Sequence, residues 1–248
     1  MNEVVKYDGS LNKLNFTGLS KQDEDLFMAI LARAKDKHEY EIAFQYDELF
    51  KLIGSKRHLT IEEQFNALEN MRERIFNINS DVLFVDENGK RESHAFHIFE
   101  QWDNYEATKE INISISPRYT WLLNDLRHFV GFRLEEFVTL DSIYSKNLYR
   151  ILKEFKDYGY YIFHSPVELR AKLGIADNVR NDKIKTILEK SKKELVEKDI
   201  FSGLDFEIVK EKKRGAPIKE IRFTWDTPKE EGVISDITND SKKEERYA

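Results

Sequence analysis

The stretch 160–225 constrains the fold of this chain more than any other, because few folds share its order of elements. A short apolar strand at 160–164 leads into a short helix that ends at Gly174, and a longer helix begins near Arg180. Two strand-like runs follow, joined by the basic segment 211–216. A short helix, a turn, a longer helix and a basic-tipped hairpin predict a winged helix-turn-helix, whose second helix enters a DNA major groove.

Local signals support both helices of this module. Ser165, Pro166 and Glu168 supply an N-cap, a residue suited to the first helical position and a capping-box glutamate. Gly174 is a natural helix stop. On the longer helix, four apolar residues and one serine recur at helical spacing and define the face expected to be buried: Ile184, Ile187, Leu188, Ser191 and Leu195.

The first half of the chain repeats this pattern at a constant offset of 120 residues. The offset aligns residues with the same structural role: Tyr40 with Tyr160, Ile42 with Ile162, Leu49 with Leu169, Gly54 with Gly174, Leu68 with Leu188 and Ile75 with Leu195. Chance similarity among short amphipathic elements is the alternative, and a constant offset across strand, helix, glycine stop and helix disfavours it. The sequence therefore predicts an α+β fold with two tandem winged-helix domains.

The repeat divides the chain into three parts: an N-terminal winged-helix domain with an N-terminal arm at 1–131, a C-terminal DNA-reading winged-helix domain at 132–226, and a polar acidic tail, expected to be disordered, at 227–248. The linker is expected near His128–Phe132. In the first domain, Thr60 and Glu63 form a capping box that starts a helix with the apolar face Ile61, Phe65, Leu68, Met71 and Ile75. A hairpin with an Asn-Gly turn is expected to join 82–85 to 95–99.

Charge is distributed unevenly between these parts. The whole chain carries a net charge of −6, made up of −9 over 1–141, +6 over 142–225 and −3 over 226–248. The cationic part coincides with the helix-turn-helix pattern, which favours a polyanionic partner for this half. A lysine-rich face that is merely solvated is the alternative, and charge alone does not distinguish the two.

Composition limits the class of protein. The 40% of apolar residues are sufficient for packed cores, and no apolar run approaches the roughly 20 residues that span a membrane. The first residues lack the pattern of a secretion signal. The absence of cysteine excludes disulfides and thiolate metal sites. We therefore expect a cytoplasmic protein without a membrane partner, and we expect no metal and no cofactor.

The segment Leu140–Phe155 carries a more specific signal. Its sequence, LDSIYSKNLYRILKEF, resembles the pattern L-x-S-x-Y-S-x-x-L-Y-x-x-L-K-x-F/Y of the replication initiators of theta-replicating, iteron-controlled plasmids. The similarity continues through Val167–Ile175 and ends with Arg214–Phe223, which is similar to the closing strand of that family. It covers roughly residues 10–225, and only its 140–175 part is specific.

The resemblance implies a function that composition and spacing do not show. Members of that family have two tandem winged helices, bind repeated duplex DNA sites at a plasmid origin and promote origin opening. They recruit host replication proteins, such as a helicase or an initiator, and exist in a monomer–dimer balance in which dimers repress the promoter of the initiator gene. Each of these properties is an expectation for this chain.

Candidate DNA contacts concentrate at the start of the second helix of the C-terminal domain. The expected contact residues are Asn178, Arg180, Asn181, Lys183, Lys185, Thr186, Lys190 and Lys193, with Lys212, Lys213 and Arg214 at the wing tip. Arginine can contact guanine through two hydrogen bonds and asparagine can contact adenine in the same way, whereas lysines suit phosphates. Asp182 and Glu189 would repel phosphate from the same surface, which weakens the case for Thr186 as a base contact.

The first domain offers fewer candidates. Its basic residues, expected to hold phosphates, are Lys56, Arg57 and His58 in the turn and Lys90 and Arg91 in the hairpin. Its second helix is expected to point Glu63, Asn66, Asn70 and Arg74 outward, and the glutamates disfavour deep insertion into a groove. We expect this domain to make fewer base contacts and to carry a self-association surface, and a purely structural first domain is the alternative.

The helix expected at 141–157 is also rich in basic residues. Its apolar stripe is Tyr144, Leu148, Ile151, Leu152 and Phe155, and the basic residues off that stripe are Lys146, Arg150, Lys153 and Lys156. We expect most of these cations to be solvated.

Sequence features of an enzyme are weak in this chain. A nicking initiator needs paired metal-binding histidines and a nucleophilic tyrosine. His94 and His97 are expected on one strand with side chains on opposite faces, and Tyr144 is expected in the core. No phosphate-binding Gly-x-x-x-x-Gly-Lys-Ser/Thr loop is present. We therefore predict a non-enzymatic DNA-binding protein, and a winged-helix transcriptional regulator without initiator activity is the main alternative.

Overall fold

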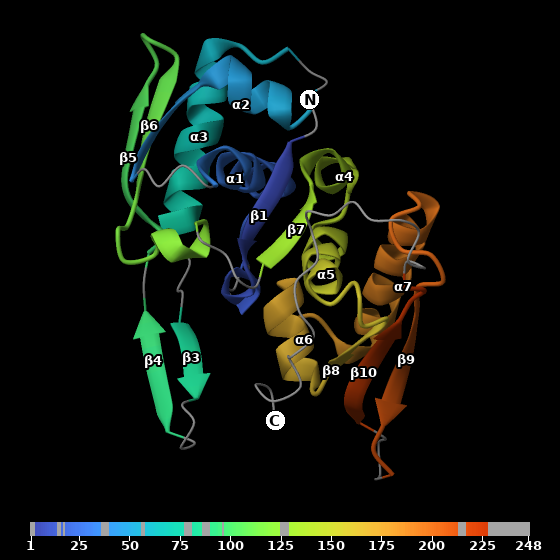
Figure 1. Ribbon diagram of the computed structural model, residues 1–248. Coiled ribbons are helices and arrows are strands. Elements are labelled where there is room, and N and C mark those ends of the chain that lie inside the picture. The colour runs from blue at the N-terminus through green and yellow to red at the C-terminus, as the bar shows by residue number, and fades with distance from the viewer. Residues whose placement is uncertain are drawn as a thin grey trace, which may run out of the picture.

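The computed structural model describes residues 3–13, 16, 18–35, 40–55, 58–76, 81–85, 90–95, 97–124, 129–212 and 217–227. Over these residues the chain forms two similar units that lie on either side of a central two-stranded ribbon (Figure 1). The expected tail lies outside the described residues, apart from Thr227. No helix among the described residues is both long and apolar enough to cross a membrane.

The second unit contains the winged helix expected from the sequence. It consists of α5 (Ile143–Glu154), β8 (Tyr160–Phe163), α6 (Pro166–Leu173), α7 (Asn181–Glu197), β9 (Asp205–Lys210) and β10 (Ile218–Thr224). The strands form an antiparallel sheet in the order β8-β10-β9. The Ser165 hydroxyl accepts a hydrogen bond from the Glu168 amide at 3.1 Å, and Gly174 ends α6 at a φ of 68°. The predicted cap and stop are both confirmed.

The first unit has the same topology. It consists of α1 (Lys21–Ala34), β2 (Glu41–Gln45), α2 (Tyr46–Leu52), α3 (Ile61–Phe76), β5 (Phe99–Tyr105) and β6 (Glu110–Ile115). Its sheet order, β2-β6-β5, matches that of the second unit. Gly54 adopts a φ of 62°, close to that of Gly174, because both residues follow the short helix and turn the chain. The repeat predicted from the 120-residue offset is therefore present in the structure.

The hairpin of the first unit differs from the prediction. β3 (Asp81–Val85) pairs with β4 (Arg91–Ala95), so residues 95–99 do not form the partner strand. The strand equivalent to β9 is β5, which pairs with β6. The β3–β4 hairpin is therefore an insertion between α3 and the wing of the first unit. It extends in the same direction as the β9–β10 hairpin (Figure 1). The expected Asn-Gly turn lies outside the described residues.

The expected arm and linker pair with one another instead of forming irregular chain. β1 (Val4–Asp8) and β7 (Phe129–Arg133) form an antiparallel ribbon, in which Val5, Tyr7, Val130 and Phe132 are buried. Val5 and Tyr7, and likewise Val130 and Phe132, alternate with residues on the other face, and this two-residue period is typical of half-buried strands. Paired strands at 4–8 and 129–133 therefore occupy described parts of the segments expected as an arm and as a linker. Residue 131, at the predicted boundary, lies inside β7.

The ribbon lies between α1 of the first unit and α5 of the second, so a continuous core joins both units (Figure 1). The single-turn helix η1 (Gly9–Lys13) follows β1, η2 (Thr120–Leu122) precedes β7, and α4 (Leu134–Thr139) follows it. On α3 the residues Leu68, Met71 and Ile75 are buried, whereas Ile61 is exposed, which differs from the predicted face.

Two cations of α5, Lys146 and Arg150, are buried, contrary to the expectation of a solvated face, whereas Lys153 and, beyond the end of the helix, Lys156 are half-buried. Lys146 is 0% exposed and its Nζ donates to Oδ1 of Asp25 on α1 at 2.5 Å and to the carbonyl oxygen of Phe137 at 2.6 Å. Arg150 is 2% exposed and its guanidinium lies over the Phe16 ring. Glu24 of α1 is buried beside them. A charged cluster therefore joins α1 to α5 at the junction of the two units.

Candidate nucleic-acid interface

The outward face of α7 carries a row of exposed cations. Ile184, Leu188, Ser191 and Leu195 are each fully buried, as their spacing predicted. This orientation leaves the other side of the helix exposed, and it carries Lys183, Lys185, Thr186, Lys190 and Lys193. Of these, Lys193 lies 3.6 Å from Glu197 on the same exposed side. The same exposed side also carries Asp182, Glu189 and Glu197, so it is mixed in charge, with the cations in excess.

The beginning of α7 presents the remaining candidates. Asn178, Arg180 and Asn181 are exposed, and Arg180 occupies the N-cap position. The Nε of Arg180 donates to Oδ1 of Asp182 at 3.1 Å, so Asp182 holds the guanidinium from one side. We expected Asp182 to repel phosphate, and the ion pair offsets part of that repulsion.

A residue that the sequence reasoning missed braces this part of the chain. Arg170 on α6 donates from Nη1 to the carbonyl oxygen of Ala176 at 2.9 Å. Its Nη2 donates to the carbonyl oxygen of Val179 at 2.6 Å and to Oδ1 of Asn181 at 2.8 Å. Nothing in the sequence pattern distinguishes Arg170 from other basic residues near a helix end.

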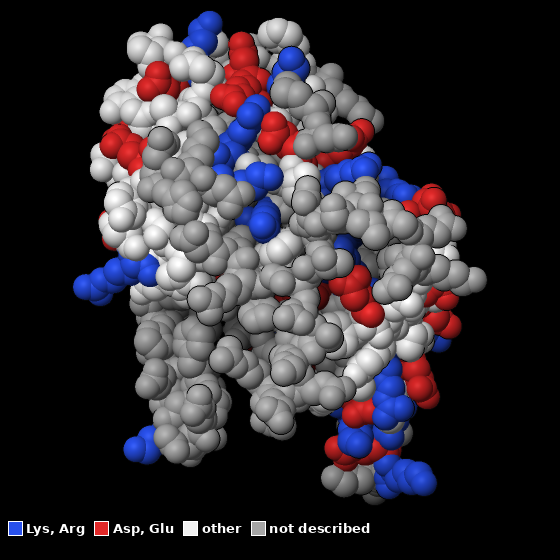
Figure 2. All heavy atoms as spheres, in the orientation of Figure 1, with Lys and Arg blue, Asp and Glu red and all other residues white. Residues whose placement is uncertain are grey.

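The wing is less uniformly basic than its sequence suggested. Lys212 is exposed, whereas Lys213 and Arg214 lie outside the described residues. Glu220 on β10 forms ion pairs with Arg222 and, at 3.9 Å, with Lys219. Figure 2 shows Lys and Arg mixed with Asp and Glu at the end of the β9–β10 hairpin. At the base of the wing, Lys192 of α7 lies 2.8 Å from Asp205 of β9 and fixes the strand against the helix.

The first unit presents a weaker cationic surface. His58 and Lys90 are exposed, Arg91 lies on β4, and Lys56 and Arg57 lie outside the described residues. Arg74, expected to point outward from α3, is engaged by Asp23: its Nε and Nη2 donate to the two carboxylate oxygens at 2.7 and 3.0 Å. Its charge therefore serves the packing of α3 against α1.

The rest of the outward face of α3 is polar and acidic. Asn66 and Asn70 are exposed, as predicted, whereas Glu63 is half-buried. The carboxylate of Glu63 accepts a hydrogen bond from the Thr60 amide at 2.9 Å, and the Glu63 amide donates to the Thr60 hydroxyl at 3.2 Å. The predicted capping box is confirmed, and it accounts for one of the glutamates that disfavour groove insertion.

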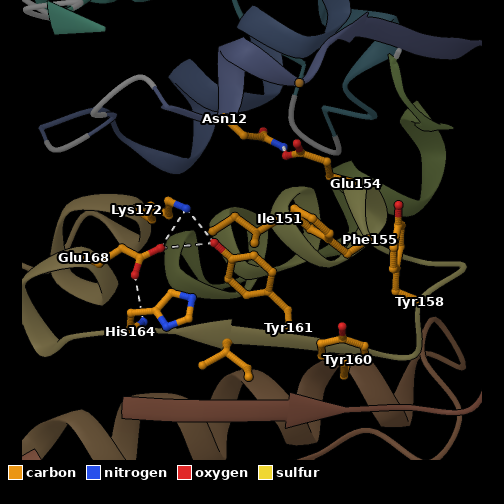
Figure 3. A pocket seen from close by; sticks show the side chains of 12 residues that line it. Asn12, Ile151, Glu154, Phe155, Tyr158, Tyr160, Tyr161, His164, Glu168 and Lys172 are labelled. Carbon is orange, nitrogen blue, oxygen red and sulfur yellow. Dashed lines mark hydrogen bonds and ion pairs between the residues drawn. The ribbon is translucent and has the colours of Figure 1, made fainter. Parts of the chain in front are cut away.

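A pocket of about 460 Å³ lies between η1, α5, β8 and α6 (Figure 3). Its aromatic wall includes Phe155 and Tyr161, and its polar side contains Glu168 and Lys172. Lys172 lies 2.9 Å from Glu168, and it also donates to the Tyr161 hydroxyl at 2.5 Å. Although burial opposes the shift, Lys172 lowers the pKa of Glu168. These two charges neutralise each other, so neither provides an uncompensated charge to attract phosphate.

The residues considered for a nicking enzyme, His94, His97 and Tyr144, do not form a site in the part of the chain that the structure describes. His97 lies beyond the end of β4, so the strand alternation expected for His94 and His97 does not apply, and its ring stacks on Phe76 at a centroid distance of 6.2 Å. The side chain of His94 is not described. Tyr144 is half-buried and packs against the core. Among the described residues, no three His, Asp or Glu side chains are grouped to hold a metal ion.

Two units of identical topology, each with a helix-turn-helix and a β-hairpin wing, define a tandem winged-helix protein. A family model described as "Initiator Replication protein, WH1" matches residues 4–153, and one described as "Initiator Rep protein, WH2" matches residues 167–225. The chain belongs to this family of initiator replication proteins. The first match extends through α5, which by topology opens the second unit.

Individual relatives agree with the family. A probable replication protein rep from Bifidobacterium longum (strain NCC 2705) is 29% identical over 159 residues, which are 64% of this chain and 52% of the relative. The chain thus spans about half the length of that relative. In a crystal structure of the Pi initiator protein in complex with iteron DNA, the protein has the same fold at a TM-score of 0.64 and 15% identity, covering 90% of this chain and 97% of that chain.

Proposed function

We propose that this chain is a plasmid replication initiator that binds repeated sites in duplex DNA. The observation that carries the proposal is the outward face of α7, where exposed cations lie on the helix that a winged-helix domain places in the major groove. Membership of the initiator replication family and the fold shared with the Pi initiator support it. In this proposal the chain acts by binding DNA, without cofactor and without strand cleavage.

The second unit supplies most of the sequence discrimination in this proposal. Arg180 is held by Asp182 through Nε, and the two terminal nitrogens of a guanidinium suit O6 and N7 of guanine. Lysines along α7 suit the phosphates that border the groove. The β3–β4 and β9–β10 hairpins extend in the same direction, so both can lie along one duplex (Figure 1).

The remaining activities of the proposal concern partners. The chain opens the origin and recruits host replication proteins, and its dimers repress its own promoter. We assign self-association, or contact with those proteins, to the first unit. The outward face of its α3 is polar and acidic, and Arg74 on that helix is bound by Asp23. A regulator that only represses would bind the same sites. When it is supplied in trans to a minimal plasmid that lacks its gene, it would fail to support replication, whereas an initiator would support it.

Substitution of Arg180 tests the DNA-reading role. We expect Arg180→Ala to weaken binding to the cognate site by about 1–3 kcal/mol, because a bidentate base contact is lost. Its effect on random duplex DNA should be small. Competition binding with cognate and random DNA measures both, and Lys190→Ala serves as the matched control that should weaken both DNAs alike. An equal loss on both DNAs for Arg180→Ala would make Arg180 a phosphate contact and refute the assignment.

A further inference from the structure

The loop between α6 and α7 is held by a single side chain. Gly174 ends α6, and the Val179 amide donates to the carbonyl oxygen of Ala176 at 3.0 Å to close the following turn. The guanidinium of Arg170 donates to the carbonyl oxygens of both Ala176 and Val179. Its third contact, to Oδ1 of Asn181, links this braced loop to the first residue of α7.

The contact with Arg170 fixes the orientation of the Asn181 amide. A guanidinium carries only hydrogen-bond donors, so the amide atom that faces it must be the oxygen. The Nδ2 group of Asn181 therefore lies on the other side of the amide. Since Asn181 is exposed at the N-terminal end of the helix that enters the groove, this donor group is what the residue offers to a base edge.

We propose that Arg170 is a specificity-determining positioning residue, which makes Asn181 select guanine over adenine. An asparagine that contacts adenine needs its oxygen to accept from N6 and its nitrogen to donate to N7. With the oxygen turned to Arg170, the donor group matches O6 and N7 of guanine, which are both acceptors. The inference rests on the proposed function, and it replaces the adenine contact expected from the sequence.

The test begins with the sites that the full-length chain selects from a random duplex DNA library. Asn181→Ala then identifies the base pair at which residue 181 acts, as the position where base preference is lost. At that base pair the wild type should favour guanine over adenine by about tenfold, the discrimination typical of a good base contact.

Removal of Arg170 should free the amide to rotate. In Arg170→Met the preference for guanine over adenine at that base pair should fall below about threefold, because a free amide can satisfy either base. Preferences at the other base pairs should remain. Arg170→Lys keeps the charge, but its single nitrogen cannot take the two separate positions of Nη1 and Nη2, so it should show the same shift. Lys172→Met removes a positive charge from the same helix without touching Asn181 and should keep the wild-type preference.

Three results would overturn the inference. The wild type could select adenine at this base pair, Asn181→Ala could leave the base preference unchanged at every position, or the Arg170 variants could keep the preference for guanine. A uniform loss of affinity for every sequence in both Arg170 variants, with lower melting temperatures, would reduce Arg170 to a structural role. If the wild type enriches no sequence at all, the proposed function itself fails, whereas an enriched site with an unchanged Arg170→Met preference refutes only this inference.

Discussion

Helices α5 and α7 belong to the same unit and both carry basic residues, yet two cations of α5 and the cations of α7 have opposite environments. Lys146 and Arg150 of α5 are buried against α1, whereas Lys185 and Lys190 of α7 are exposed. The difference arises because α5 is covered on two sides, by the core of its own unit and by the first unit. Of these two helices, α7 is the one with a basic face exposed to a polyanion.

A basic residue can therefore be assigned to DNA binding or to packing only when its burial is known. The first unit opens α1 with three consecutive acidic residues, Asp23, Glu24 and Asp25, all of them buried. Two of them face the cations of α5, and Asp23 binds Arg74 of α3. Six charges therefore serve to join helices, and the net charge of each half overstates what is available to DNA.

Removal of a buried cation of α5 should have the largest effect on stability. Lys146→Ala should destabilise the chain by about 3–5 kcal/mol, because it leaves Asp25 buried without its partner. Chemical denaturation monitored by circular dichroism measures the loss. Lys146→Met combined with Asp25→Leu removes both charges at similar volume and should recover most of the stability. A single variant as stable as the wild type would mean that Lys146 is solvated after all.

The buried carboxylates should make stability depend on pH. Burial raises the pKa of Glu24 to about 7 and that of Asp25 to about 6. Since the unfolded chain loses these protons at lower pH, the folded state binds more protons between about pH 4 and 7, and its stability should fall as pH rises through this window.

Glu24→Gln isolates that contribution from other groups. The variant cannot ionise, so it should be more stable than the wild type at pH 8 by about 1–3 kcal/mol and nearly equal to it at pH 5. Thermal or denaturant unfolding at both pH values measures the difference. A variant that is less stable than the wild type at pH 8 would show that the Glu24 carboxylate is needed in its charged form.

A smaller effect is expected for the ion pair at the base of the wing. Lys192 and Asp205 are both partly exposed, so Asp205→Asn should cost less than about 1 kcal/mol of stability. Because the pair holds β9 against α7, the substitution should reduce the free energy of DNA binding by more than it reduces the free energy of unfolding. The same unfolding and binding measurements on Glu207→Gln, which removes a negative charge from an exposed position of the same strand, provide a matched control.

The fold could be predicted from the sequence where local signals and repetition agree. Ser165, Gly174 and the apolar face of α7 predicted the second unit, and the 120-residue offset predicted the first. The β1–β7 ribbon was missed because its paired residues are 121 to 129 positions apart in the sequence, and their pairing depends on the assembled core. The second strand of the β3–β4 hairpin was misplaced at 95–99, because two hairpins follow α3 in succession and the strand that begins at Phe99 belongs to the next one.

The candidate site was only partly predictable. The exposure of Lys185 and Lys190 follows from helical spacing. The engagement of Arg74 by Asp23 and of Asn181 by Arg170 depends on side chains of other helices, which spacing within one helix does not reveal. The acidic triplet at 23–25 and the cations of α5 are complementary, and this complementarity was the signal that could have placed Lys146 and Arg150 inside.

The salt dependence of DNA affinity for Lys185→Ala and Lys190→Ala tests whether the outward face of α7 binds the DNA backbone. Binding of wild type and variants to one duplex is measured across a range of salt concentrations, and the logarithm of affinity is plotted against the logarithm of salt. If each lysine neutralises a phosphate, each substitution should reduce the slope by about 0.9, while the melting temperature stays unchanged. Slopes identical to that of the wild type would contradict the claim that the outward face of α7 is the surface that binds DNA.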